Sequence, residues 1–238
     1  MSPAEIAAAA DRIAADLAAL PSATVPSHRT ARRRESALLK RADGADVVAL
    51  GVALVGRVPR WFTCELVGEH PGALAALEIG SVEALGRGLA SWYDTDGFGI
   101  PISGTAWLLG RIGDDDVRRW AESPDLWWRR TALVSTVVLN TKSRGGRGDT
   151  ARTLDIAARL VGDREDMVVK AMSWALRSLV PWDAAAVQGF LAEYEGRVAA
   201  RAVRETRTKL ETGRKNRKAG RRENADRTSS PAGVPALR

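Results

Sequence analysis

The sequence of 238 residues contains little cysteine, little histidine and no long apolar run, and each shortage excludes a class of protein. Cys64 is the only cysteine, so an internal disulfide and a multi-cysteine metal cluster are excluded. With only His28 and His70, zinc chemistry is not expected, and neither is any cofactor. Apolar stretches such as residues 47–55 are far shorter than the roughly 20 residues of a membrane span. We therefore expect a cytoplasmic protein of the bacterial type without a signal peptide.

Positive charge is concentrated at the C-terminal end of the chain. The formal net charge is +7, but residues 212–238 hold eight Lys or Arg against two acids, so the remainder keeps a net charge of +1. These last residues are also polar and short of apolar anchors, which predicts a basic, disordered tail after a folded domain of residues 1–211. Inside that domain, residues 129–152 carry a net charge of +5, a local patch that suits an acidic partner.

Apolar residues recur at intervals of three and four along almost the whole chain, as in amphipathic helices. Strand-like alternation is scarce. Periodicity and capping residues predict helices over residues 3–20, 29–43, 45–57, 59–68, 71–77, 80–91, 97–110, 114–122, 124–140, 148–161, 164–180, 183–193 and 196–211. Short helices joined by tight turns predict an all-α fold of the α-solenoid type, in which each helix pair covers the apolar face of the next.

Tryptophan accounts for eight of the thirteen aromatic residues. Most tryptophans pack in protein cores, and we expect this of Trp61, Trp107, Trp120 and Trp127. The count by itself therefore indicates no function.

The remaining tryptophans stand beside charged residues at informative spacings. Trp92 precedes Asp96 by four residues, and Trp174 lies four after Lys170 and three before Arg177. Side chains three or four residues apart share one face of a helix. An aromatic ring beside a carboxylate and a cation suits a cationic or sugar-phosphate ligand.

Several separated segments, in the right order, resemble the signature segments of the DNA alkylation repair family of HEAT-like-repeat DNA glycosylases. They are RWFTCELVGEHP from Arg60, SWYDTD from Ser91, SPDLWWRRTALV from Ser123, MVVKAMSWALRSLV from Met167 and VRETRTKLETG from Val203. The resemblance covers about residues 29–213. It implies a curved superhelix of helical repeats whose concave face binds duplex DNA containing alkylated bases, in a protein that acts as a monomer in base excision repair.

The resemblance also implies an activity, the excision of positively charged purines such as 3-methyladenine and 7-methylguanine. The W-x-x-x-D pair of the family falls on Trp92 and Asp96, its arginine on Arg130, and its second tryptophan on Trp174. Such a purine leaves as a neutral base, so the costly species is the cationic deoxyribose, which Asp96 would stabilise while orienting the attacking water. The two indole rings would flank the sugar, and Arg130 would hold a phosphate. The other candidate DNA contacts are Arg129, Lys142, Arg144, Arg147, Lys170 and Arg177.

Several of these residues have alternative roles. Asp94 stands two residues before Asp96 and could be the carboxylate that faces the DNA, and Asp96 could cap a helix that begins near Gly97. Arg130 could form a surface ion pair with Asp125.

Other interpretations concern the protein as a whole. The same fold could be a catalytically inactive HEAT-like module that binds DNA structures or acts as a protein scaffold, or it could be a peptide-binding α-solenoid. A scaffold has no need of a carboxylate in a phosphate-binding groove, and a peptide-binding solenoid predicts an uncharged or acidic groove. Within the enzyme interpretation, Lys170 could be the Schiff-base nucleophile of a lyase, although an exposed lysine at the start of a helix more often binds phosphate or solvent.

Overall fold

The computed structural model describes residues 1–22 and 24–214, and all regular structure in this part is helical. The helices are α1 (Pro3–Ala18), α2 (Val25–Leu39), α3 (Gly44–Leu54), α4 (Arg60–Gly68), α5 (Pro71–Ala76), α6 (Ile79–Leu85), α7 (Trp92–Phe98), α8 (Gly104–Leu108), α9 (Asp114–Ala121), α10 (Leu126–Leu139), α11 (Thr150–Arg159), α12 (Asp166–Leu179), α13 (Ala184–Glu193) and α14 (Ala200–Thr212). None of these helices is long and apolar enough to cross a membrane. The predicted all-α class is confirmed.

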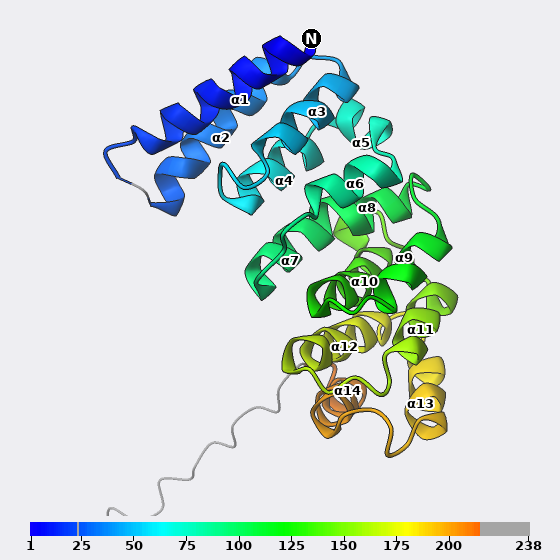
Figure 1. Cartoon of the computed structure of the whole chain (residues 1–238). Helices are drawn as coiled ribbons and strands as arrows, with labels where there is room; N and C mark the ends of the chain where they lie inside the picture. Colours follow the sequence, from blue (N-terminus) through cyan, green and yellow to red (C-terminus); the bar gives the residue numbers. More distant parts are fainter. Residues whose placement is uncertain (23, 215–238) are drawn as a thin grey trace, which may run out of the picture.

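The helices stack in two layers that follow a curve (Figure 1). One layer consists of α2, α4, α7, α10, α12 and α14, and each of these contacts the next. We call it the inner layer because it lies on the hollow side of the curve, at the left of Figure 1. The other layer contains α1, α3, α5, α9, α11 and α13, and its members cover the opposite side.

Polar contacts between neighbouring helix pairs recur at a nearly constant separation along the chain. In the inner layer, Ser173 on α12 donates to Glu205 on α14, 32 residues away. In the outer layer, Arg118 on α9 donates to Asp155 on α11, 37 residues away. The repeating unit is therefore a helix pair, and contacts rather than sequence identity show the repeat.

The helix expected over residues 97–110 begins earlier and contains an irregular turn. Ser91 caps it, with the Ser91 hydroxyl accepting a hydrogen bond from the third helical N–H. After Phe98 the chain forms a π-helical turn, Gly99–Ser103, before α8. Pro101 lies in this turn, and a wider turn accommodates a residue that has no N–H to donate. Asp96 is thus inside a helix, and the expectation that it could cap a helix starting near Gly97 is wrong.

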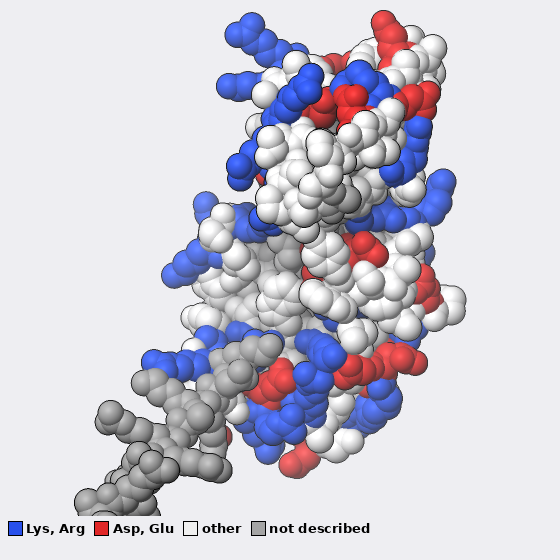
Figure 2. All heavy atoms as spheres, turned by 90° about the vertical axis from the view of Figure 1, so that its left-hand side faces the viewer, with Lys and Arg blue, Asp and Glu red and all other residues white. Residues whose placement is uncertain are grey.

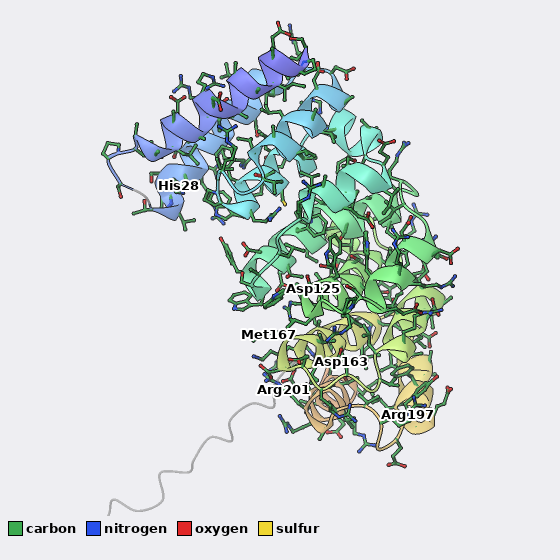
Figure 3. The ribbon with its side chains drawn as sticks, in the orientation of Figure 1. His28, Asp125, Asp163, Met167, Arg197 and Arg201 are labelled. Carbon is green, nitrogen blue, oxygen red and sulfur yellow. The ribbon has the colours of Figure 1, made fainter. Side chains whose placement is uncertain are left out.

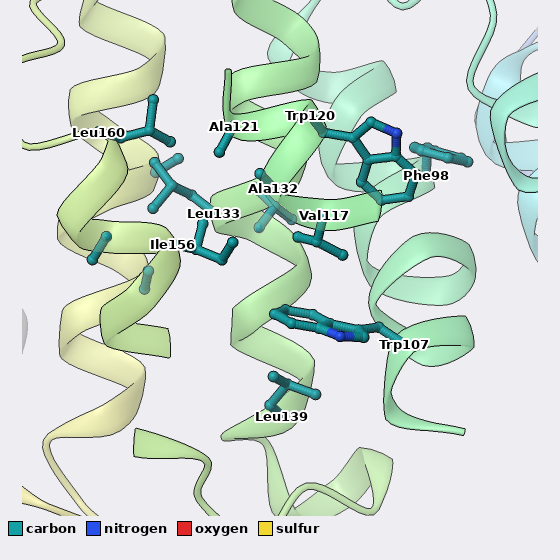
Figure 4. Close-up of a cluster of buried hydrophobic side chains, with 14 of the residues drawn as sticks. Phe98, Trp107, Val117, Trp120, Ala121, Ala132, Leu133, Leu139, Ile156 and Leu160 are labelled. Carbon is teal, nitrogen blue, oxygen red and sulfur yellow. The ribbon is translucent and has the colours of Figure 1, made fainter. Parts of the chain in front are cut away.

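The core runs between the layers along the length of the stack. Trp107 and Trp120 are buried, as predicted, in the larger of two clusters of apolar side chains, and Trp127 is partly buried against it. Trp61 is buried, also as predicted, in the smaller cluster. Figure 4 shows Trp107 and Trp120 among the aliphatic side chains of α9, α10 and α11. Burial of such large rings contributes much of the apolar area that holds successive helix pairs together.

Helices α8 and α10 approach closely at Gly104. A Cβ at this position would lie 2.6 Å from Cγ2 of Val138 and 2.9 Å from the carbonyl oxygens of Gly99 and Ser135. Gly104→Ala should therefore destabilise the protein by about 1–3 kcal/mol, the usual cost of overpacking, measured by denaturant unfolding. Gly189→Ala is the matched control, because no atom lies within 4 Å of its Cβ, and it should stabilise α13 by about 0.5–1 kcal/mol. Equal effects of the two substitutions would contradict this packing.

The tail predicted for residues 212–238 lies almost entirely outside the described residues. Thr212 is the last residue of α14, and Gly213 ends the helix with a positive φ of 68°. The disorder of the tail stays a prediction.

Candidate active site

One pocket in the inner layer brings together the four residues expected at the active site. Trp92, Asp96, Arg130 and Trp174 line a hollow of about 500 Å³. The remaining lining residues are Met167, Lys170, Arg177, Arg201 and Glu205. Figure 3 labels Met167 and Arg201 on the hollow side of the curve.

A larger hollow, of about 880 Å³, lies between α13 and α14 at the end of the stack and shares only Glu205 with this pocket. It contains no tryptophan, so it lacks the combination of ring faces and charges that marks the smaller pocket.

Asp96 and Arg130 form a forked ion pair at the centre of the pocket. Nη2 of Arg130 lies 2.8 Å from Oδ1 and 3.0 Å from Oδ2 of Asp96, and Nε lies 3.1 Å from Oδ1. Nη1 donates to the carbonyl oxygen of Met167. The Arg130 side chain is only 6% exposed, whereas that of Asp96 is 23% exposed. This geometry makes Arg130 a partner of Asp96, and the contact with a phosphate that the sequence analysis expected of it stays a prediction.

The alternative prediction, that Arg130 forms an ion pair with Asp125, is wrong. Asp125 instead caps α10, and its Oδ1 accepts a hydrogen bond from the backbone N–H of Trp127 at 2.9 Å.

Burial raises the pKa of Asp96 above its ordinary value of 3.8, and this effect outweighs the lowering by the charge and hydrogen bonds of Arg130. The ionised carboxylate is therefore incompletely solvated. A negative charge on a partly buried carboxylate interacts strongly with a positive charge that develops beside it.

The side chain of Asp94 lies at the N-terminus of α7, outside the pocket that contains Asp96. Its backbone N–H donates to Oγ of Ser91 at 3.1 Å, and its Oδ2 accepts from the same hydroxyl at 2.8 Å. Asp94 thus belongs to the N-terminal cap of α7 and does not line the pocket. Of the two carboxylates, Asp96 is the one that lines the pocket.

The two tryptophans of the pocket keep part of their ring surface open. Trp174 is half-buried, and Trp92 is 53% exposed. Trp92 packs edge-on against Tyr93, with ring centroids 5.9 Å apart, and Tyr93 is 47% exposed. Exposed aromatic rings are costly in water and mark binding surfaces when they lie together, so this end of α7 is suited to a ligand.

Lys170 and Arg177, both predicted to bind DNA, line the pocket. Nζ of Lys170 lies 2.6 Å from Asp166. Nε of Arg177 donates to Ser173 at 3.0 Å, but its nearest carboxylate, Glu205, lies 3.9 Å away. Burial lowers the pKa of Arg177, since the attraction of Glu205 offsets only part of the desolvation. Arg177 is therefore a poorly compensated cation that would gain from a bound anion.

Arg201 is a pocket residue that the sequence analysis missed. It lies 3.2 Å from Asp166 and 3.1 Å from Glu205. Its position four residues before Glu205 on a predicted helix was a usable signal, since that spacing places both on one face.

The other predicted DNA contacts lie elsewhere. Arg129 pairs with Asp163 at 2.8 Å and donates to the carbonyl oxygens of Ser123 and Pro124, so it joins the turn before α10 to the turn before α12. The remaining three, Lys142, Arg144 and Arg147, are exposed in the loop after α10, beyond the end of that helix farther from Arg130.

The structure is an all-α protein whose inner layer contains a pocket lined by tryptophans and by residues of both charges. A family model described as DNA alkylation repair enzyme matches residues 62–210, which is more than half of the chain and includes every residue that lines the pocket. The chain belongs to this DNA alkylation repair enzyme family. Comparisons with curated proteins and with solved structures found no significant match.

Proposed function

We propose that this protein is a DNA glycosylase that removes positively charged alkylated purines, of the 3-methyladenine or 7-methylguanine type, from duplex DNA by hydrolysis of the N-glycosidic bond. The observation that carries the proposal is the partly buried carboxylate of Asp96, held by Arg130 in a pocket that Trp92 and Trp174 also line. Family membership supports DNA as the substrate.

The stacked helix pairs are an α-solenoid of HEAT-like repeats, and duplex DNA lies against the hollow inner layer. The pocket opens on this layer. In Figure 2, which views the hollow side, Lys and Arg gather along the left-hand border and across the lower part of the face, and the part between is largely uncharged. These cations would neutralise the phosphates of a duplex and provide affinity that does not depend on sequence.

The reaction requires little help for the leaving group. Cleavage of the bond between C1′ and the purine nitrogen returns an electron pair to a cationic ring, which leaves as a neutral base. The deoxyribose becomes an oxocarbenium-like cation, which Asp96 stabilises through its negative charge. A water molecule then adds to C1′, and Asp96 orients it and accepts its proton. The faces of Trp92 and Trp174 favour the positive charge on the sugar.

The other pocket residues position these groups. Arg130 holds both oxygens of Asp96 in one orientation, so it is a positioning residue. Lys170, Arg177 and Arg201 bind the phosphates that flank the damaged nucleotide. Arg177 is the strongest candidate, because Glu205 only partly compensates its charge.

The proposal is tested with duplex DNA that contains a single 7-methylguanine. Wild-type protein should release the free base, detected by mass spectrometry, and leave an abasic site in the strand. Tight binding of this duplex without release at any protein concentration would favour the inactive DNA-binding module instead.

The rate of release should fall as the pH is lowered through the pKa of Asp96, because a protonated carboxyl cannot stabilise the sugar cation. Burial raises this pKa above 3.8, so the fall should begin at a higher pH than an ordinary aspartate would give. Single-turnover rates from acid to neutral pH, corrected for uncatalysed depurination, test this expectation. The residual rate of Asp96→Asn should lack this acid limb, and an identical limb in that variant would assign it to another group.

A further inference from the structure

The loop from Thr141 to Gly148 presents a group of cations that have no acidic partner. Lys142, Arg144 and Arg147 are exposed, and no described carboxylate pairs with any of them. Nζ of Lys142 lies over the ring of Trp182, 5.0 Å from its centroid. In the pocket, by contrast, Arg130, Lys170 and Arg201 all have carboxylate partners.

The loop is held rigidly by the helices beneath it. A Cβ at Gly146 would lie 2.3 Å from the carbonyl oxygen of Val138, so only glycine fits there. The Trp182 indole N–H donates to the carbonyl oxygen of Asn140 at 2.8 Å, and the Asn140 side chain donates to Thr153 at 2.9 Å. A ligand that binds the three cations therefore need not order the loop backbone first.

Helix α10 connects the pocket to this loop. Arg130 lies near the start of α10, and the loop begins at Thr141, eleven residues later. With a rise of about 1.5 Å per residue, Arg130 and Thr141 are separated by about 16 Å along the helix axis. This exceeds the width of either groove of B-DNA, roughly 6 Å and 12 Å. Phosphates that reach the loop are therefore not those that flank a sugar at Asp96.

We propose that Lys142, Arg144 and Arg147 bind phosphates of the strand opposite the damaged nucleotide. This inference rests on the proposed function, because it takes the sugar at Asp96 as the reference point. The start of α10, with Arg130, lies toward one border of the inner layer, and the loop lies beyond the end of α10, toward the other border. A duplex laid along the curve has one strand near each border. The pocket cations hold the damaged strand, and the loop holds the complementary strand. Contacts with both strands prevent the duplex from rotating about its own axis, so that one sugar stays against Asp96.

The test uses Arg144→Gln/Arg147→Gln in an Asp96→Asn background, so that binding is measured without turnover. The matched control is Arg118→Gln/Arg159→Gln, which removes the same charge from α9 and α11 of the outer layer. The DNA is a set of duplexes, each with one 7-methylguanine and one uncharged methylphosphonate at a chosen position in either strand.

Loss of the two loop arginines should reduce the slope of log affinity against log salt by about two, one for each phosphate contact. Methylphosphonates in the opposite strand that weaken binding of the parent protein should no longer do so, and those in the damaged strand should keep their effect. The control should change neither result. An unchanged salt slope, or a loss of sensitivity confined to the damaged strand, would overturn the proposal.

Base release is measured separately with the otherwise unchanged protein. A lack of release combined with a reduced salt slope in the loop variant would overturn the proposed glycosylase activity, while the contact of the loop with DNA would stand.

Discussion

Asp96→Asn should lower the single-turnover rate of base release by at least ~10²-fold, the usual scale for removing a preorganised electrostatic group. The amide keeps the shape of the side chain and an oxygen that accepts from Arg130, but it has no charge to offer the sugar cation. Thermal stability should fall, because the amide nitrogen cannot accept a hydrogen bond and the buried charge of Arg130 loses its carboxylate partner. Binding of damaged duplex by the folded protein should change little, because the cations of the pocket remain. The measurement is release from a 7-methylguanine duplex at saturating protein.

Asp94→Asn is the matched control, since the same substitution falls two residues away in the cap of α7. The amide oxygen of asparagine can still accept from the Ser91 hydroxyl, so both stability and release should stay close to wild type. A crippled Asp94→Asn beside an active Asp96→Asn would move the catalytic role to Asp94. Two silent substitutions in a protein that still excises would contradict the mechanism.

Arg130→Ala should abolish most activity at neutral pH and destabilise the protein by about 3 kcal/mol. This is the low end of the cost of breaking a buried ion pair, because Asp96 remains partly exposed. Urea unfolding and single-turnover release measure the two effects. Arg130→Lys should be intermediate, because lysine keeps the charge but cannot hold both carboxylate oxygens in a fork.

The pH profile distinguishes positioning from phosphate binding at Arg130. The charge and the hydrogen bonds of Arg130 both lower the pKa of Asp96, so their loss raises that pKa further. The acid limb of Arg130→Ala should therefore move to higher pH, with part of the activity recovered in alkaline buffer. The salt dependence of DNA binding should stay the same. A slope reduced by about one, with an unmoved pH profile, would show that Arg130 contacts a phosphate instead.

Local pattern accounts for how well the helices and the core were predicted from the sequence. Amphipathic spacing and capping residues act within a few positions of one another, so most predicted helices agree with the structure. The helix expected over residues 29–43 instead spans Val25–Leu39, the one expected over 80–91 ends at Leu85, and the region around Pro101 also differs. There a π-helical turn continues the helix, and the break expected before Gly97 is absent. Trp107 and Trp120 lie on apolar faces, and their burial follows from the same periodicity.

The tertiary structure alone decided which charges belong to the site. Residues 129–152 form one basic patch in the sequence, yet the structure divides it. Arg129 pairs with Asp163, Arg130 pairs with Asp96, and the cations of the loop after α10 have no partner among the described carboxylates. Successive residues of a helix point about 100° apart, and each of these two arginines finds its partner 34 residues away, in a neighbouring helix pair. The sequence by itself determined the helices, their apolar faces and the residue types available for chemistry. The stacking of helix pairs selected Asp96 over Asp94 and assigned Arg130 to it, because those contacts exist only between segments distant in the chain.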